Sequence, residues 1–425
     1  MRKNLFLLLS VAMTVLSACS KEADRQDAVP QSLVRGADVS AVFDTARLHR
    51  IDRAFEAYVD SGWIPNASVM VVHDGRIVYE RAFGYRDRER NQPCRPTDIF
   101  RIASQTKAIA VVGLMTLFEE GKFQLDEPIK RYIPSFANPQ VLTSYDEQSR
   151  CYTTRPASRD ITIRDLITHT SGLSYQGYYW DIAQSLGIRP LNSLDSITLA
   201  QNAERMGYMP LAHDPGQQFT YSMNVDVLGS LCEILSGKDI ETFLHERVLD
   251  PLGMTETFFY LPEEQADRLV TLYDYPEGGP LQRSANDLYQ RYPIGGARML
   301  KSTGAGMSGT VEDYAKFCQM ILNHGEFNHH RILSRKTLEM MQQNGVGQMR
   351  GEIGFGMAWD VFTPQNAHNT IISEGSMRWG GMFGTDYVID PREKLILLMY
   401  TNMETNHSGR SPKTLLHNVA YQALK

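Results

Sequence analysis

A run of apolar residues from 105 to 120 constrains the fold of this chain more than any other feature. The run ends at Gly121 and has the pattern of a helix that starts next to Ser104. Its apolar residues occupy every side of that helix, and such a helix has to be surrounded by other elements. With 425 residues, of which 42% are hydrophobic, the chain can bury it in one large domain or two closely packed ones.

Strand patterns occur at both ends of the chain. Residues 67–72 and 77–83 are rich in β-branched and aromatic residues, and Asp74-Gly75 between them is a strong hairpin signal. Residues 384–390 and 395–400 form a second pair of strand patterns around a turn. The middle of the chain mixes helical stretches with long loops. The sequence therefore predicts one sheet built from both ends, with a helical region inserted between them.

The first residues have the pattern of an export signal. A basic start precedes an apolar run, 5–16, that is too short to span a bilayer, and the run ends in Leu16-Ser17-Ala18-Cys19. Small residues before a Cys resemble the lipobox of bacterial lipoproteins, in which the Cys thiol carries a diacylglycerol. The alternative is an ordinary signal peptide with an incidental Cys. We expect a signal peptide at 1–19, lipidation at Cys19 and a polar tether at 20–40.

The expected location follows from that signal. A lipidated Cys19 would anchor the protein in the bacterial cell envelope, at the outer membrane facing the periplasm or the surface. The sequence does not say which face holds it. The net charge of −6 and the lack of a basic stripe argue against a nucleic-acid partner.

Metal and disulfide signals are weak. His324, His329 and His330 lie close together among polar residues, and we interpret them as a solvated loop, so neither a metal nor another cofactor is predicted. Cys94 and Cys151 lie in polar, loop-like sequence and could pair, which the sequence leaves open. The two remaining cysteines lie among apolar helical residues and are expected to fill the core; they are Cys232 and Cys318.

A Ser-x-x-Lys motif, Ser104 to Lys107, lies at the start of the predicted buried helix. Residues three apart share a helix face, so the lysine amine can reach the serine hydroxyl. Burial favours the neutral amine, which can accept a proton, and the helix N-terminus adds a positive dipole near the serine. The pair therefore suits a nucleophile and its base. The alternative is a helix-capping Ser followed by a surface Lys.

Two further segments suit the same chemistry. Tyr221 follows a turn-rich stretch, and a phenol beside a lysine ammonium can share its proton. Tyr400 fits the looser Y-x-N pattern better, but it ends a strongly apolar strand and is interpreted as a packing residue. Trp379-Gly380-Gly381-Met382 precedes a strand, and its glycines would let a substrate approach an edge strand that offers an N–H to an oxyanion.

In chain order, these three segments resemble the serine β-lactamase and penicillin-binding-protein-like superfamily, in its class C β-lactamase-related branch. A Trp-Gly-Gly third motif is similar to that of the carboxylesterases of this branch. Further matching phrases extend over most of the chain; they are Phe100-Arg101-Ile102-Ala103, Leu166-Ile167-Thr168-His169-Thr170-Ser171-Gly172-Leu173, Pro251-Leu252-Gly253-Met254-Thr255 and Gly304-Ala305-Gly306-Met307-Ser308-Gly309-Thr310.

The resemblance implies a role for each matching residue. Ser104 would be acylated, and Lys107 and Tyr221 would act as base and proton shuttle. The oxyanion hole would be formed by the backbone N–H groups of Ser104 and Met382. The other residues expected to bind substrate are Trp379, Gly380, Gly381, Ser222 and Asn224. His169 is interpreted as structural, and the aromatic stretch 175–180 either lines an acyl pocket or packs a loop.

Two departures from the family pattern bear on the substrate. Penicillin-recognising members usually start the third motif with a Lys or His that attracts a substrate carboxylate, whereas this chain has Trp379. Their second motif ends in Asn, but Met223 stands at that position and Asn224 comes one residue late. Both changes put a β-lactam preference in doubt and leave hydrolytic chemistry intact.

The resemblance implies an α/β (α+β) fold: a three-layer αβα sandwich with an antiparallel sheet plus an inserted, mainly helical domain. We expect the hydrolase domain at 41–425, with its α/β part at about 41–105 and 300–425 and the insertion at about 106–299. The expected function is an exported serine hydrolase of esterase type. The alternatives are a β-lactamase, a D-amino-acid peptidase or amidase on cell-wall or peptide substrates, and a catalytically silent scaffold.

Overall fold

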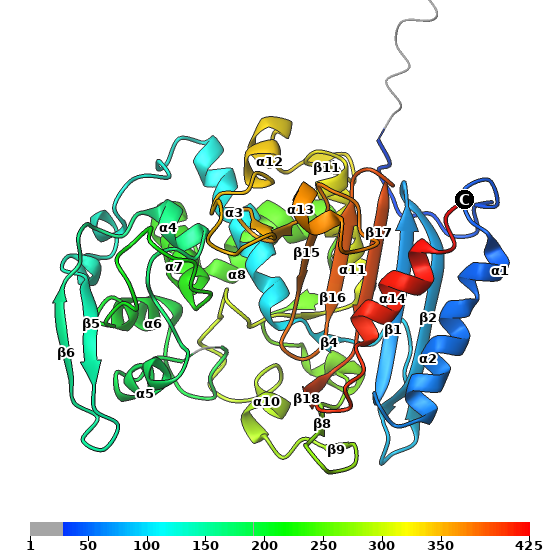
Figure 1. The fold of residues 1–425 in the computed structure, drawn as a ribbon, viewed down its shortest axis with the longest axis horizontal. Coiled ribbons are helices and arrows are strands. Elements are labelled where there is room, and N and C mark those ends of the chain that lie inside the picture. Colours follow the sequence, from blue (N-terminus) through cyan, green and yellow to red (C-terminus); the bar gives the residue numbers. More distant parts are fainter. Residues whose placement is uncertain (1–28, 190) are drawn as a thin grey trace, which may run out of the picture.

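A computed structural model describes residues 29–189 and 191–425 (Figure 1). The predicted signal peptide, with Cys19, lies outside the described residues. The described part of the predicted tether, residues 29–40, is attached to the first hairpin of the sheet. Val34 bonds to the turn of the first hairpin through its N–H and the Gly75 carbonyl, at 2.9 Å, and Arg35 pairs with Glu80 at 2.9 Å.

An antiparallel sheet of eight strands is built from both ends of the chain, as predicted. Its central pairing joins residues 68–73 to 395–400, so that Ser68 lies opposite Tyr400 and His73 opposite Leu395. In spatial order the strands are β13 (Gly354–Phe355), β14 (Asp360–Val361), β15 (Met377–Gly380), β16 (Asp386–Asp390), β17 (Leu395–Tyr400), β1 (Asn66–His73), β2 (Arg76–Asp87) and β3 (Gln92–Pro93).

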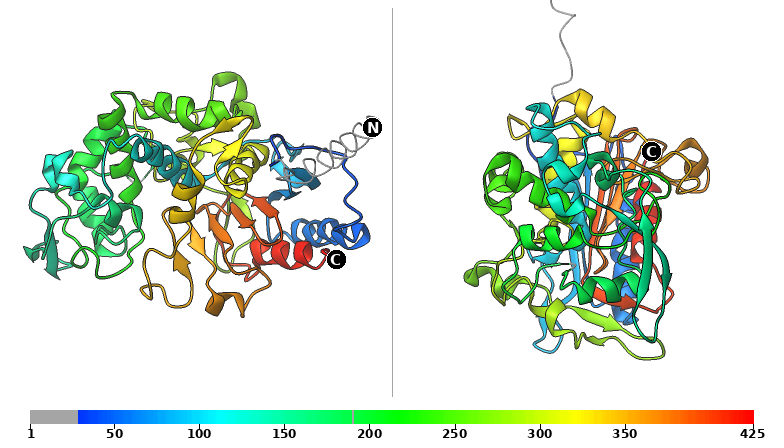
Figure 2. Two further views of the ribbon diagram at one scale, coloured as in Figure 1. Left: turned by 90° about the horizontal axis from the view of Figure 1, so that it is seen from above. Right: turned by 90° about the vertical axis from the view of Figure 1, so that its left-hand side faces the viewer.

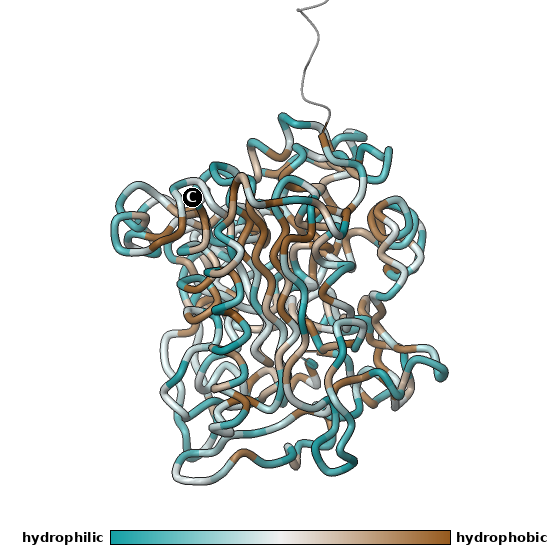
Figure 3. Tube along the Cα trace, turned by 90° about the vertical axis from the view of Figure 1, so that its right-hand side faces the viewer, coloured by the Kyte–Doolittle hydropathy of each residue, from teal (hydrophilic) through white to brown (hydrophobic). Residues whose placement is uncertain are grey.

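Helices cover both faces of this sheet and give the expected three layers (Figures 1 and 2). One face packs against α1 (Thr45–Leu48), α2 (Arg50–Asp60) and α14 (Pro412–Tyr421), and the other against α11 (Val311–Leu322). The central strands are hydrophobic on both faces (Figure 3), because they are buried on both sides. Val69 and Val71 of β1 point to α2 and α14, whereas Met70 and Val72 point to the opposite core.

The apolar run forms α3 (Thr106–Glu119), which follows a 3-10 turn, η1 (Ala103–Gln105). Every residue of α3 from Thr106 to Leu117 is buried, so the expectation of a surrounded helix is confirmed. Its neighbours include α7 (Asn224–Ser236) and α8 (Ile240–Leu244). Gly113 makes the close approach to α8 feasible, because a Cβ there would lie 2.6 Å from the Leu244 side chain.

The helical region lies on the opposite side of α3 from the sheet (Figure 1). Its helices include α4 (Ile163–Ile167), α5 (Tyr178–Ser185) and α6 (Leu199–Met206). The remaining helices are α9 (Asp250–Leu252), α10 (Asp287–Arg291), α12 (Arg335–Met341) and α13 (Pro364–Ala367), with short turns η2 (Ile129–Arg131), η3 (Pro134–Phe136), η4 (His245–Leu249) and η5 (Glu263–Arg268).

Short strands form four smaller sheets among the described residues. The first pairs β4 (Phe100–Arg101), β10 (Ser308–Gly309) and β7 (Thr257–Phe258), and the second pairs β18 (Met403–Asn406), β8 (Tyr273–Tyr275) and β9 (Gln282–Arg283). The other two are hairpins: β5 (Gln140–Tyr145) with β6 (Tyr152–Pro156), and β11 (Glu326–Phe327) with β12 (His330–Arg331). In the described part of the chain, no helix has both the length and the apolar character needed to cross a bilayer.

The open question on the cysteines is settled against a disulfide. Cys94 is a free thiol buried near the end of β3, whereas Cys151 is a free thiol exposed at the turn of the β5–β6 hairpin, on the far side of the helical region (Figure 1). Their loop-like sequence gave no information on this separation. Cys232 on α7 and Cys318 on α11 are fully buried, which confirms that they fill the core.

Candidate active site

A cavity of about 840 Å³ opens between the edge of the sheet and the helical region, at the start of α3. Its lining combines aromatic rings with several charged side chains. The lining residues are Ser104, Lys107, Tyr175, Gly177, Trp180, Leu191, Tyr221, Met223, Asp226, Tyr289, Gly304, Ala305, Arg350, Asp360, Arg378, Trp379, Gly380, Gly381, Met382, Asp386 and Lys413. Among the described residues no group of three or more His, Cys, Asp or Glu could hold a metal ion, and this includes His324, His329 and His330.

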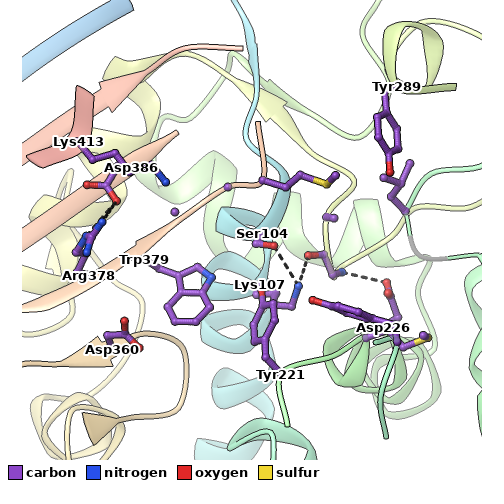
Figure 4. Close-up of a pocket in the computed structure, with 18 of the residues that line it drawn as sticks. Ser104, Lys107, Tyr221, Asp226, Tyr289, Asp360, Arg378, Trp379, Asp386 and Lys413 are labelled. Carbon is purple, nitrogen blue, oxygen red and sulfur yellow. Dashed lines mark hydrogen bonds and ion pairs between the residues drawn. The ribbon is translucent and has the colours of Figure 1, made fainter. Parts of the chain in front are cut away.

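Ser104 and Lys107 meet at the start of α3 (Figure 4). The Lys107 Nζ lies 3.5 Å from the Ser104 Oγ and donates a hydrogen bond of 2.7 Å to the Gly304 carbonyl. Ser104 stands in the 3-10 turn, directly after Ala103, whose φ of +44° is strained for a residue with a side chain. The buried lysine is therefore held against the serine by a second, fixed acceptor.

Tyr221 lies beside this pair (Figure 4). Its ring centroid is 4.7 Å from the Lys107 Nζ and 5.1 Å from the Trp379 ring. Its hydroxyl is buried and has no hydrogen-bond partner among the described residues. The hydroxyl is therefore available for a proton transfer, and Ser104, Lys107 and Tyr221 share one site.

His169 supports Tyr221 from behind. Its ring lies 4.6 Å from the Tyr221 ring, and its Nδ1 accepts from the Ser222 N–H at 3.3 Å and from the Asn224 amide at 3.0 Å. Burial lowers the pKa of His169 well below its ordinary value, and the charges of Lys107 and Arg350 lower it further. A neutral, fully buried ring with two donors fits the structural role expected for it.

Ser222 and Asn224, for which a role in substrate binding is expected, are not among the residues that line the cavity. Both are fully buried, and Asn224 accepts from the Ser171 hydroxyl at 2.8 Å. The reason is that α7 starts at Asn224, whose side chain turns toward His169 and the core. Met223 and Asp226 face the cavity in their place.

The glycine pair after Trp379 has a structural reason that the sequence did not show. A Cβ on Gly381 would lie 2.4 Å from the Ile102 carbonyl, and a Cβ on Gly380 would lie 2.6 Å from the Thr385 carbonyl. The glycines therefore let the end of β15 pack directly against the chain that leads into Ser104. Beyond them, the backbone N–H of Met382 donates no hydrogen bond within the described part of the chain.

Charged residues near β15 were missed by sequence reasoning. Arg350 pairs with Asp360, and its guanidinium carbon lies 4.6 Å from the Phe219 ring centroid and 5.8 Å from that of Trp379. A cation thus reaches the region of Trp379 from a distant loop. No motif marks such residues, because isolated charges in loops look like ordinary surface.

A second charged group surrounds Asp386. Burial alone would raise the pKa of this carboxyl, but Arg378, His417 and Lys413 together lower it. Arg378 pairs with Asp386 at 3.0 Å, and burial lowers the pKa of the Lys413 amine. This group and Arg350 give the cavity a polar end beside Trp379.

The aromatic stretch 175–180 divides between its two expected roles. Tyr175 and Trp180 line the cavity, whereas Tyr178 is exposed and stacks on Tyr145 with ring centroids 4.9 Å apart. Tyr179 is buried and packs against Tyr178. One part of the stretch is therefore a pocket wall and the other packs a loop.

Comparison with known proteins defines the class. The Beta-lactamase family model matches residues 51–421. Esterase EstB of Burkholderia gladioli is 29% identical over 382 residues, which cover 85% of this chain and 91% of EstB. ML-236A carboxylate methylbutanoyltransferase mlcH of Penicillium citrinum is 30% identical over 387 residues, 83% of this chain and 89% of mlcH.

A solved structure extends the match to the fold. EstCE1, a hydrolase with promiscuous acyltransferase activity, aligns with a TM-score of 0.72 and 26% identity over 89% of this chain and 98% of EstCE1. Fold and relatives together define a serine hydrolase. The chain belongs to the β-lactamase family.

Proposed function

We propose that the protein is an esterase that forms an acyl-enzyme on Ser104. The observation that carries this proposal is the contact of Ser104, Lys107 and Tyr221 at the end of a cavity lined largely by aromatic and apolar side chains. Such a lining suits an apolar acyl group. The name of Esterase EstB supports an ester substrate.

The geometry suggests a sequence of proton transfers. The Ser104 Oγ attacks the ester carbonyl carbon while its proton passes to the Lys107 Nζ, with the Tyr221 hydroxyl as relay. The N–H groups of Ser104 and Met382 hold the oxyanion. The alcohol leaves with that proton. Water then attacks the acyl carbon and gives its proton to the same groups. The bond between the acyl carbon and the Ser104 Oγ breaks as that oxygen takes the proton back, which releases the acid and restores the free serine.

A second candidate is acyl transfer to an alcohol in place of water. The cavity is large enough for an acyl group and an acceptor together, at about 840 Å³, and both mlcH and EstCE1 are named for acyl transfer. β-Lactam and D-amino-acid substrates remain alternatives. Met223 and Trp379 argue against them, because each replaces a polar group that would hold such a substrate.

The test uses protein that lacks residues 1–19, beside Ser104→Ala. Each is incubated with a fluorophosphonate, a short-chain nitrophenyl ester with and without added alcohol, and a chromogenic cephalosporin. Ser104-dependent labelling with ester turnover supports the esterase, and product that contains the added alcohol supports acyl transfer. Dominant cephalosporin turnover would identify a β-lactamase. Labelling without turnover would point to a peptidase or amidase, and no labelling to a silent scaffold.

We also propose that the protein is exported and anchored through Cys19. The support is the basic start, the apolar run and the small residues before that cysteine. Cys19→Ala should release the protein from the membrane fraction into the soluble fraction after cell lysis. Continued retention of the variant in the membrane fraction would refute the anchor.

A further inference from the structure

Asp226 is a buried carboxylate in the first turn of α7, three residues after Met223 and on the same face of the helix. Its Oδ1 accepts hydrogen bonds from the Ser302 hydroxyl at 2.9 Å and from the Gly304 N–H at 3.0 Å. Its Oδ2 has no hydrogen-bond partner among the described residues, although it is buried. An unpartnered carboxylate oxygen in the lining of the cavity calls for a physical explanation.

Residue Gly304 connects this carboxylate to Lys107. The N–H of Gly304 donates to Asp226, and its carbonyl accepts from the Lys107 Nζ at 2.7 Å. A Cβ at this position would lie 2.7 Å from the Asp226 Oδ2, so only glycine lets the carboxylate come this close to the loop. Asp226 thus fixes the acceptor that holds the lysine amine against Ser104.

The charges of the two residues also act on each other. Burial raises the pKa of Asp226 to about 6, while the Gly304 N–H and the charge of Lys107 oppose that rise. The groups that face Asp226 are Lys107 on α3 and the Ser302, Thr303 and Gly304 donors of the loop. A carboxylate removed from water and left with a free oxygen is stabilised most by a nearby cation. A charged Asp226 therefore stabilises the positive charge that Lys107 gains when it accepts a proton.

We propose that Asp226 is a positioning residue for acylation, which holds Gly304 against Lys107 and stabilises the ammonium formed when the Ser104 proton passes to the amine. The inference rests on the proposed role of Lys107 as base. It also accounts for Met223: a methionine cannot polarise Lys107, and Asp226 supplies a polar group from the next turn of the same helix. No proton leaves Asp226 in the step, since the proton travels from Ser104 to Lys107 and on to the leaving alcohol.

The test is Asp226→Asn in the full-length protein, because asparagine keeps an oxygen for Gly304 and Ser302 but removes the charge. The rate of fluorophosphonate labelling and the ester kcat should fall at least tenfold, short of the ~10²–10⁴-fold expected when the base itself is lost. KM should stay within about twofold of the parent value. The acid limb of the pH–rate profile should disappear, because burial raises the pKa of Asp226 to about 6 and asparagine has no proton to gain in that range.

Two matched variants control for structure. Asp313→Asn removes another buried carboxylate, paired with Lys316 on α11 away from the cavity, and should leave the acid limb unchanged. Ser302→Ala removes one hydrogen bond to Asp226 without removing its charge, and should keep an acid limb that moves to higher pH, because that hydrogen bond lowers the pKa of Asp226. An Asp226→Asn enzyme with an unchanged limb and only a lower melting temperature would overturn the proposal. If Lys107→Met kept full activity, the base assignment itself would fail, independently of Asp226.

A measurement on the parent protein keeps the proposal testable if Asp226→Asn does not fold. The acid limb of labelling should respond little to temperature, since carboxyl ionisation has a small enthalpy and that of an amine or imidazole is large. If the acid limb of the parent protein shifts strongly with temperature, it does not report a carboxyl group. Provided that Lys107→Met is inactive, such a shift would contradict the role proposed for Asp226.

Discussion

The position of single atoms decides what the site can do. The Lys107 amine has two fixed neighbours, the Ser104 hydroxyl and the Gly304 carbonyl, and the Tyr221 ring covers it on a third side. A lysine held in this way has lost most of its rotational freedom before a substrate arrives. The loss of side-chain conformational entropy therefore takes place on folding, and it does not add to the barrier of the reaction.

We expect Lys107→Met to lower the ester kcat by ~10²–10⁴-fold, because the variant keeps the length of the side chain but cannot accept the Ser104 proton. Steady-state kinetics with a nitrophenyl ester measure the effect. Lys301→Met is the matched control, since Lys301 pairs with Asp239 and Glu241 outside the cavity lining. Near-parental turnover by Lys107→Met would show that another group is the base.

Residues of the site differ in how far the sequence could predict them. Ser104, Lys107 and Tyr221 lie close together, and each of them stands in a local motif that can be read from the sequence. Arg350 and Lys413 enter the cavity from distant loops and helices, so no local pattern points to them. The burial of Asn224 could not be predicted either, because polarity alone does not tell whether a residue at a helix start faces the core or the cavity.

At the scale of elements, short segments position the site from behind. Helix α4 leads into the loop that carries His169, and it begins with a capping box in which Thr162 and Asp165 exchange hydrogen bonds. Asp165 also forms a two-pronged ion pair with Arg159, at 2.6 and 2.8 Å, and accepts from Thr170 at 3.2 Å. One carboxylate thus ties the helix start to the loop behind Tyr221.

We expect Asp165→Asn to lower the free energy of unfolding by about 1–2 kcal/mol at pH 7. Burial would raise the pKa of Asp165, but Arg159 and Thr162 lower it below its ordinary value. Its contribution is therefore present above the unfolded pKa of about 3.9 and is lost as pH falls through the folded pKa. Urea unfolding should show the gap between parent and variant closing below about pH 4. A gap that is constant with pH would contradict this assignment.

The end of β15 gives a second prediction for an element. Gly381→Ala would push a Cβ to within 2.4 Å of the Ile102 carbonyl and the Thr385 hydroxyl. We expect the strand end to move away from the Ser104 turn, with a loss of ester kcat of about tenfold or more, since small misplacements at such sites are costly. Gly295→Ala is the control, because its Cβ would meet no atom closer than 3.4 Å.

The helices and strands that the sequence predicts correctly are those with a clear hydrophobic or turn pattern. The hairpin around Asp74-Gly75 and the helix at 105–120 are present with nearly the expected bounds. The β5–β6 hairpin was not foreseen, since its residues are mostly exposed and polar and so show no alternation of buried side chains. The first strands of the sheet edge, β13 and β14, have two residues each, too few for any periodicity.

At the scale of the whole molecule, the segment at residues 43–44 is joined to the C-terminal end of the chain. Phe43 forms a bridge with Leu424, and the Asp44 N–H donates to the Ala423 carbonyl at 2.8 Å. The C-terminal helix α14 packs on α2 and on β17, where Leu416 and Ala420 belong to the core. The sequence predicted a sheet built from both ends, but not that helices at both ends would share one layer.

We expect removal of residues 410–425 to unfold the whole protein and not only its C-terminal part. The truncation removes α14 and so exposes an apolar face of the central sheet to water. Truncation should yield insoluble protein or a broad unfolding transition by circular dichroism. Removal of Lys425 alone, which is exposed, should leave the melting temperature within about 2 °C of the parent. A soluble, cooperatively folding truncation would show that the sheet is complete without α14.

The pairing of β1 with β17 also has a consequence for how the chain is made. A growing chain presents residues 66–73 early, yet their partner at 395–400 is synthesised almost last. Until then one edge of β1 has no partner strand, and α3 lacks part of the core around it. The finished fold is therefore out of reach during translation, and the complete polypeptide is available to chaperones or a translocation channel before its active site exists.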